Sequence, residues 1–299
     1  MSHSVTIEND AFRMEVWPEI GGKVASLVDK ADNHELFFSY PAEIPDQRPR
    51  YDNTYADSWC AGWDECFPSV APSRYVGFPY DGIASPDHGE LWGLPTTAVP
   101  TRNGITTVWH GLRFGYRLTR KLHLEDQSIL ADYTLVNLAP FPFRFVWAQH
   151  VLLALRQQMV VEIPAAGEWR FSHNASGERK DEPFRWPRLG DLDLSLPESL
   201  PAGKGWKVFS SSPIDAPAVL RYPARSRRLT IEITVPENLK CYWGVWISTG
   251  GWAQHRQLSL EPTTGRFDEL DRCIRDHSAA MIDPLGKMEW QVKWTTGAG

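Results

Sequence analysis

The chain has 299 residues, of which 42% are hydrophobic and 23% are charged, and its formal net charge is −6. This composition is typical of a soluble globular protein that is long enough to bury a sizeable core. The mild negative charge, without a dense basic run, argues against a nucleic-acid surface. The 14 tryptophans are unusual, because their rings can fill a core but can also stack on sugar rings.

The four cysteines form no CxxC pair and have no zinc-like spacing with histidine. We therefore expect free, reduced thiols, which fits a cytoplasmic protein. The first residues show no signal peptide, and no apolar run is long enough for a membrane-spanning helix. The sequence thus predicts a cytoplasmic protein without a membrane partner, and it leaves the oligomeric state open.

Short strands are predicted along most of the first half of the chain. A polar turn is expected at residues 30–35, and residues 43–63 show no periodicity, which predicts a long loop. Loops of this length are uncommon unless they line a site or are disordered. Period-two patterns and β-forming residues place the strands at residues 5–9, 12–17, 23–27, 36–38, 107–110, 114–124, 129–137 and 143–155.

The second half continues in the same way, with a polar surface excursion at residues 172–205. A single short helix is predicted at residues 267–275. Many short strands, little helix and no linker predict one all-β sandwich that forms a single domain over residues 1–299. Further strands are expected at residues 229–235, 242–247, 257–261 and 288–294.

The segment around Glu261 is the first candidate for chemistry. Leu258 and Leu260 alternate with Ser259 and Glu261, as in a half-buried strand. Pro262 cannot continue a central ladder, so we expect the strand to end there, with Glu261 held rigidly beside a loop. A carboxylate in that position can be aimed at a ligand, although an ordinary strand-end glutamate in solvent fits as well.

Two histidines are the other candidates. His88 is followed by Gly89, which allows the backbone to turn sharply beside the imidazole; a turn histidine bonded to a carbonyl is the alternative. His150 has apolar neighbours on both sides, which predicts burial. A buried neutral histidine needs a hydrogen-bond partner, so a satisfied core histidine is the alternative here.

Together the three residues suggest one reaction. Proton transfer at the acetal carbon of a sugar needs an acid and a base on opposite sides of the ring. A glutamate that is charged at neutral pH and a histidine near its titration point form such a pair.

The order of four short segments then resembles aldose 1-epimerases. These segments are residues 19–27, 87–89, 149–150 and 260–265. Over nearly its whole length the chain is similar to the galactose mutarotase-like superfamily, and this resemblance implies a β-supersandwich fold without a cofactor. It also implies that His150 acts as an acid on the ring oxygen, Glu261 as a base on the anomeric hydroxyl, and His88 as an assisting hydrogen-bond partner.

The chain departs from the family where an arginine often binds sugar hydroxyls. Asp64 and Glu65 occupy one such region and Trp92 occupies the other, while Arg74 is a candidate substitute. We therefore expect Asp64, Glu65, Arg74 and Trp92 to bind substrate. A structural turn and a core indole are the alternatives for Asp64, Glu65 and Trp92.

No sequence spacing indicates a metal site or a phosphate cradle. The chain lacks a HExxH motif, an HxH pair, an acidic calcium loop and a glycine-rich turn that opens a helix. We thus expect a cofactor-independent aldose 1-epimerase-like isomerase that acts on a small sugar, with phosphorylation of that sugar left open. A sugar-binding sandwich without catalysis, a metal-dependent sugar isomerase, and a lyase or hydrolase of the same fold are the rival hypotheses.

Overall fold

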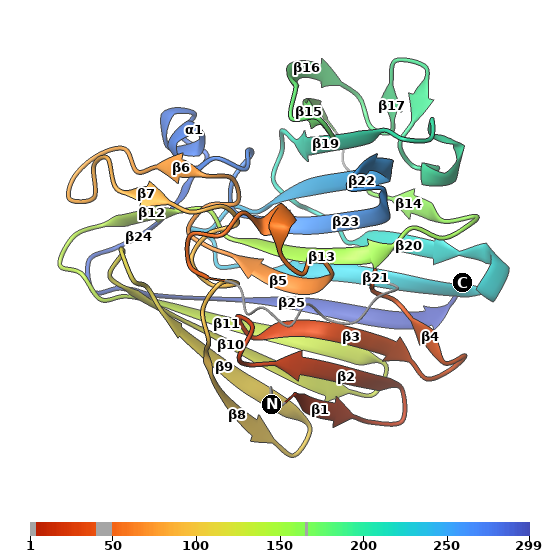
Figure 1. The fold of residues 1–299 in the computed structure, drawn as a ribbon, viewed down its shortest axis with the longest axis horizontal. Coiled ribbons are helices and arrows are strands. Elements are labelled where there is room, and N and C mark those ends of the chain that lie inside the picture. Colours follow the sequence, from red (N-terminus) through yellow and green to blue (C-terminus); the bar gives the residue numbers. More distant parts are fainter. Residues whose placement is uncertain (1–3, 40–49, 165–166) are drawn as a thin grey trace.

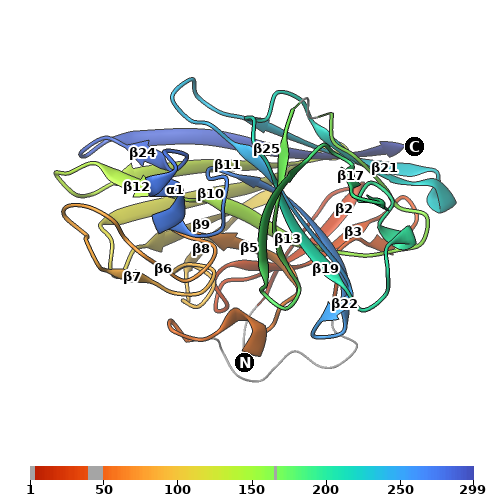
Figure 2. The ribbon, with the colours of Figure 1, turned by 90° about the horizontal axis from the view of Figure 1, so that it is seen from above.

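The computed structural model describes residues 4–39, 50–164 and 167–299. Two antiparallel sheets dominate the structure and face each other as two layers (Figures 1 and 2). The larger sheet has 11 strands, with β4 (His34–Glu35) attached to β3, in the order β1 (Val5–Glu8), β2 (Phe12–Trp17), β3 (Lys23–Asp29), β5 (Gly62–Cys66), β13 (Ala148–Ala154), β23 (His255–Thr263), β22 (Tyr242–Trp252), β19 (Gly205–Ser210), β15 (Trp169–Asn174) and β16 (Arg179–Phe184).

The smaller sheet has eight strands, in the order β14 (Val160–Glu162), β20 (Ala218–Tyr222), β21 (Arg227–Thr234), β25 (Lys287–Ala298), β11 (Ser128–Asn137), β10 (Tyr116–Glu125), β9 (Gly104–His110) and β8 (Thr97–Thr101). Three two-stranded ribbons complete the β-structure: β6 (Ser73–Arg74) with β7 (Ala84–Ser85), β12 (Phe143–Phe145) with β24 (Ala280–Ile282), and β17 (Arg188–Leu189) with β18 (Leu192–Asp193).

Helix is scarce in the described residues. They contain one α-helix, α1 (Leu270–Arg275), and three single 3-10 turns, η1 (Tyr55–Asp57), η2 (Pro197–Ser199) and η3 (Pro223–Arg225). None of the helices in this part of the chain has the length and apolar character needed to cross a membrane. The prediction of an all-β fold with little helix is confirmed.

A hydrophobic core fills the space between the two sheets. The stacked rings of Trp63 on β5 and Trp294 on β25, with centroids 5.7 Å apart, connect the layers. A buried ion pair lies in the same region, where Arg120 Nη1 of β10 is 3.0 Å from Glu65 Oε1 of β5. Residues of both sheets share one buried cluster. This supports the expected single domain over residues 1–299, which stays a prediction.

Four local predictions need correction. Residues 34–35 form strand β4 instead of a turn, and Phe37 makes only an isolated bridge to Leu153. The long loop ends before Gly62, because residues 62–66 belong to β5; its residues 43–49 lie outside the described part. The helix starts at Leu270 instead of residue 267. The last three residues of β15, strand β16 and the first residue of β19 lie in the predicted surface excursion, and these strands extend the larger sheet.

Candidate active site

Polar side chains of β5 and β13 lie on both faces of the larger sheet, because successive residues of a strand point to opposite faces. Glu65 points into the core between the sheets, where it meets Arg120. Its neighbours Asp64 and Cys66 therefore point to the opposite, outer face. Asp64 lies opposite His150 in the register of β5 and β13, so His150 shares that outer face.

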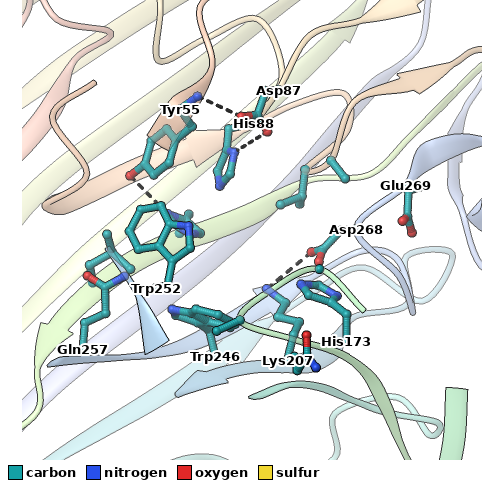
Figure 3. A pocket seen from close by; sticks show the side chains of 17 residues that line it. Tyr55, Asp87, His88, His173, Lys207, Trp246, Trp252, Gln257, Asp268 and Glu269 are labelled. Atoms are coloured by element: carbon teal, nitrogen blue, oxygen red, sulfur yellow. Dashed lines mark hydrogen bonds and ion pairs between the residues drawn. The ribbon is translucent and has the colours of Figure 1, made fainter. Parts of the chain in front are cut away.

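A cavity of about 280 Å³ lies on this outer face, and Figure 3 shows its lining. This volume is near the low end of the range for small-molecule pockets and suits one small ligand. The side chains come from β13, β15, β19, β22 and β23 and from the segments around η1, before Gly89 and before α1. Those that carry polar or aromatic groups are Tyr55, Asp87, His88, His150, His173, Asn174, Lys207, Trp246, Trp252, Gln257, Asp268 and Glu269.

His150 and Glu261 approach each other where the ladder between β13 and β23 is interrupted. Ala148 pairs with Thr263 on one side of this gap, and Leu153 pairs with Leu258 on the other side. The same register places His150 opposite Glu261. His150 Nε2 is 4.0 Å from Glu261 Oε1. The gap thus allows two polar side chains to face each other, His150 in the lining of the cavity and Glu261 behind it.

The expected strand end at Glu261 is wrong, because β23 continues to Thr263. Pro262 is paired with Trp243 of β22 on one side. On the other side it lies in the gap towards β13, where no ladder hydrogen bond is needed from its nitrogen. Glu261 is consequently a completely buried residue inside a strand.

Glu261 is held by a lysine that the sequence did not single out. Lys207 Nζ of β19 lies 2.5 Å from Glu261 Oε2 and 3.4 Å from Asp268 Oδ1. Burial by itself would lower the pKa of Lys207, but the two carboxylates outweigh it and raise this pKa. Oε1 of Glu261, in contrast, is buried without a hydrogen-bond partner among the described residues. One carboxylate oxygen is therefore fixed and the other is available as an acceptor.

His88 is presented by the predicted glycine turn. Both His88 and Gly89 have positive φ, of 57° and 77°. A Cβ on Gly89 would lie 2.2 Å from the carbonyl oxygen of Phe67, so a side chain cannot be accommodated there. Asp87 Oδ1 lies 2.9 Å from Nδ1 of His88, so Nε2 is the ring nitrogen that remains for a ligand in the cavity that His88 lines.

His150 is enclosed by aromatic and basic groups. Burial lowers its pKa well below 6.5, and the charges of His88, Lys207 and Lys23 act in the same direction. The hydroxyl of Tyr55 lies 3.5 Å from His150 Nδ1 and donates a hydrogen bond to Asp64. In the resting protein His150 is thus a neutral imidazole that has a polar neighbour at each ring nitrogen, Tyr55 at Nδ1 and Glu261 at Nε2.

Of the seven expected site residues, His88 and His150 line the cavity, whereas Glu261 lies behind its lining and the other four do not line it either. Asp64 is buried behind Tyr55 and pairs with Lys23. Trp92 lies behind the same tyrosine, edge to face, and donates its indole N–H to the backbone carbonyl of Asp87. Both residues support the lining from behind.

Glu65 and Arg74 lie elsewhere. Glu65 is part of the core between the sheets, where Tyr133 and Trp147 donate hydrogen bonds to it in addition to Arg120. Burial raises its pKa, and the hydrogen bonds and the guanidinium oppose that rise. Arg74 is exposed, and its guanidinium donates to the carbonyl of Gly82. Neither side chain is placed to contact a ligand in the cavity.

Three side chains near the cavity offer atoms that can bind a metal ion. One ligand atom each from Cys66, His88 and His150 lies within 4.8 Å of the other two. The ligands come from three distant segments, so sequence spacing could not have indicated this cluster.

Comparisons of the fold identify close architectural relatives. No protein-family model matches the chain, and no curated protein sequence does. Among solved structures, the Slr1438 protein from Synechocystis sp. PCC 6803 is similar, with a TM-score of 0.75, 16% identity, and coverage of 100% of this chain and 97% of that one. A candidate aldose 1-epimerase from Escherichia coli K12 has a TM-score of 0.71 and 15% identity, with both chains fully covered. A galactose mutarotase-like protein from Lactobacillus casei has a TM-score of 0.69 and 18% identity, with coverage of 99% of this chain and 100% of that one.

The chain has the galactose mutarotase-like fold. The resemblance that the sequence motifs suggested is thereby confirmed at the level of architecture. Identities of 15–18% show the fold alone, and the chemistry of this chain depends on its own side chains.

The sequence analysis did not identify several residues that line the cavity. Tyr55 lies in the unpatterned loop, whose length was a signal for a site. His173 and Asn174 lie in the segment that was expected at the surface. Lys207 carried no local signal, because it meets Glu261 only through the pairing of distant strands. Asp268 carried none either, and it contacts the same lysine.

Proposed function

We propose that the chain is an aldose 1-epimerase-like isomerase that interconverts the α and β anomers of a sugar by acid–base ring opening. The observation that carries this proposal is the 4.0 Å approach of Glu261 Oε1 to Nε2 of His150, which lines the cavity. An acid and a base at this spacing can act on the two oxygens of one anomeric carbon. The fold shared with galactose mutarotase-like proteins supports the same activity.

In the proposed reaction, Glu261 is the base and His150 is the acid. Lys207 holds Oε2 of Glu261, and Oε1 accepts the proton of the anomeric hydroxyl. His150 gives a proton to the ring oxygen as the bond from that oxygen to C1 breaks, which produces the open-chain aldehyde. Rotation about the C1–C2 bond and closure by the reverse steps give the other anomer. His88 assists through its free Nε2, and no cofactor takes part.

Two features of the site without a sugar have to change in the proposed reaction: the burial of Glu261 and the neutral state of His150. Glu261 is completely buried, and its polar neighbours Lys207 and His150 line the cavity. A sugar therefore reaches Oε1 only if one of these two side chains moves. Burial also keeps His150 neutral, so the imidazolium that donates the proton is a minor species at neutral pH. Catalytic contacts are commonly looser at rest than in the reacting complex.

The lining of the cavity favours an uncharged sugar over a sugar phosphate. Among the described residues that line it, Lys207 is the one lysine or arginine, and it is already paired with Glu261 and Asp268. Asp87 and Glu269 add further carboxylates. A phosphate dianion would be repelled by this set, whereas sugar hydroxyls can donate to it. Trp246 and Trp252 offer ring faces for the apolar side of a sugar ring.

Anomer exchange measured by saturation-transfer NMR tests the proposal directly. The panel would contain free aldoses and their 6-phosphates, with the uncatalysed exchange of each sugar as the reference. We expect acceleration for at least one free aldose and weaker or no acceleration for the phosphates. No acceleration for any sugar that binds would contradict the proposal.

A sugar-binding protein without catalysis is the second candidate. The complete burial of Glu261 favours it, because a binder does not need this carboxylate to reach the ligand. A lyase or hydrolase on long chains fits less well, since the cavity of about 280 Å³ holds little more than one small ligand. A cytoplasmic location and a small sugar as partner stay predictions.

A further inference from the structure

The cluster of Cys66, His88 and His150 has a composition that the proposed acid–base chemistry does not require. Anomer exchange uses the two histidines but has no role for a thiol. Cys66 nevertheless points to the same face as His150, because Ala148 pairs with Cys66 and His150 pairs with Asp64 in the register of β13 and β5. We propose that these three side chains form a binding site for zinc, and that bound zinc inhibits anomer exchange.

The distances fit a tetrahedral ion after a small movement. The three ligand atoms lie within 4.8 Å of one another. In a tetrahedral zinc site with ordinary Zn–N and Zn–S bonds, neighbouring ligand atoms are about 3.3–3.8 Å apart, so each pair has to close by at most about 1.5 Å. Cys66 and His150 lie on adjacent strands of the sheet, and the movement required is one of their side chains towards His88 and each other.

The surroundings of His88 resemble the support that metal-binding histidines usually have. Asp87 Oδ1 lies 2.9 Å from His88 Nδ1, and Asp87 Oδ2 accepts a hydrogen bond of 2.8 Å from the backbone N–H of Tyr55. The ring of Tyr55 stacks on that of His88, with centroids 3.9 Å apart. A carboxylate on Nδ1 fixes the tautomer and leaves the lone pair of Nε2 for a metal ion. This arrangement, visible in Figure 3, is independent of the thiol.

The ligand types select the ion. One sulfur and two imidazole nitrogens suit Zn²⁺ and disfavour Mg²⁺ and Ca²⁺, which prefer oxygen. Three protein ligands leave a fourth position for water on the cavity side. Burial raises the pKa of the Cys66 thiol, so the thiol is protonated before the ion arrives. On binding, the S–H bond breaks, a Zn–S bond forms and the proton is released to solvent.

Zinc in this position would occupy the nitrogens that the isomerase needs. His150 could no longer carry a proton to the ring oxygen, and His88 could no longer assist it. This inhibitory consequence rests on the proposed function, whereas the binding of zinc does not. The two parts can therefore be tested separately.

Binding is tested first, on the purified full-length protein under reducing conditions. Zinc is titrated against a chromophoric chelator, and cobalt is added in its place to record thiolate-to-cobalt charge-transfer absorption. The variants are Cys66→Ser and, as a matched control, Cys241→Ser, which alters another buried free cysteine outside the cluster. We expect one zinc ion per chain and a thiolate band in the wild type and in Cys241→Ser. Because supporting groups alone change metal affinity by about 10–100-fold, Cys66→Ser should lower zinc affinity by at least about 100-fold and abolish the band.

Inhibition is tested next by NMR anomer exchange with and without zinc. We expect zinc to inhibit the wild type and Cys241→Ser, and Cys66→Ser to resist it at the same concentration. Equal zinc affinity in Cys66→Ser and wild type, or no thiolate band in the wild type, would overturn the metal site. If zinc binds with the thiolate band but the zinc-free protein exchanges no anomers, the site stands and the proposed isomerase activity fails instead.

Discussion

Lys207 reaches across strand β22 to place its ammonium 2.5 Å from Oε2 of Glu261. The residue of β22 that lies opposite Glu261 is Gly244, where a Cβ would lie 3.4 Å from that oxygen. The ion pair thus joins two strands that are not neighbours and passes over a glycine of the strand between them. Since this pair occupies one carboxylate oxygen, it determines that Oε1 is the oxygen available for chemistry.

The first prediction concerns the stability of this ion pair. Lys207→Met keeps most of the side-chain volume but leaves Glu261 and Asp268 buried without their cation. Removing one partner of a buried pair usually costs about 3–5 kcal/mol, so we expect a fall of that size in the free energy of unfolding. Chemical denaturation monitored by tryptophan fluorescence measures it.

A double variant provides the control. In Lys207→Met/Glu261→Gln the orphaned charge of Glu261 is absent, and we expect the double variant to be more stable than Lys207→Met alone. Additive losses in the two single variants would mean that the lysine and the glutamate do not interact as the distance indicates.

The second prediction concerns acid. Burial lowers the pKa of His34, His150, His173 and His255 below 6.5. Below pH 6.5 the unfolded chain therefore binds more protons at these positions than the folded chain does. The resulting loss of stability amounts to about 1.4 kcal/mol per pH unit for each extra proton.

The free energy of unfolding should therefore keep its full value above pH 6.5, and it should fall as the pH decreases towards the pKa values of these histidines in the folded protein. Denaturation curves between pH 8 and pH 5.5, recorded with a chelator present, measure this slope. His150→Gln should reduce the slope, because Gln cannot take up the proton in either state. An unchanged slope in this variant would show that His150 is not held neutral by the fold.

The third prediction concerns chelation. The proposed proton transfers need only side chains of the chain itself, so anomer exchange should survive prolonged treatment with EDTA. If trace zinc occupies the cluster of Cys66, His88 and His150, exchange should rise on chelation. Loss of activity with EDTA and recovery with one divalent ion would favour the metal-dependent isomerase instead.

The strands could be predicted well, because the alternation of apolar and polar residues along a strand is a local property of the sequence. Leu229 and Ile231 alternate with polar residues, and the strand expected at residues 229–235 is β21, which occupies residues 227–234. Glu65 shows the limit of such reasoning. Its neighbour Asp64 supports the lining, but the period of two turns Glu65 into the core, where Arg120 of a distant strand meets it. Adjacent residues in sequence thus have unrelated environments, and only the register decides which face each one takes.

The candidate site could be predicted only in part, because sequence motifs are local whereas contacts between strands are not. His88, His150 and Glu261 were found through short motifs, and the structure brings His150 and Glu261 within 4.0 Å. Lys207 and Cys66 could not be found in this way, because their partners come from other strands. The strand end expected at Pro262 was wrong, since a gap towards β13 that no local pattern reveals accommodates the proline.

The last prediction separates an isomerase from a sugar-binding protein, and it rests on Glu261. Gln at this position keeps the shape of the side chain and can still accept a hydrogen bond, but it cannot take up a proton at neutral pH. If Glu261 is the base, Glu261→Gln should slow anomer exchange by about 10²–10⁴-fold. Sugar affinity should change much less, because the lost interaction belongs mainly to the transition state.

His150→Gln provides the matching test of the acid. It should slow exchange by a comparable factor, and the double variant should lose less than the product of the two single losses, because acid and base act as one unit. Exchange rates are measured by NMR and sugar affinity by calorimetry, on variants that are first shown to be folded. In Glu261→Gln the ammonium of Lys207 keeps its contact with Asp268 but faces a neutral amide in place of the carboxylate, so the stability of this variant has to be recorded alongside. Unchanged exchange in a folded Glu261→Gln variant would exclude this carboxylate as the base, and the sugar-binding alternative would then explain the cavity better.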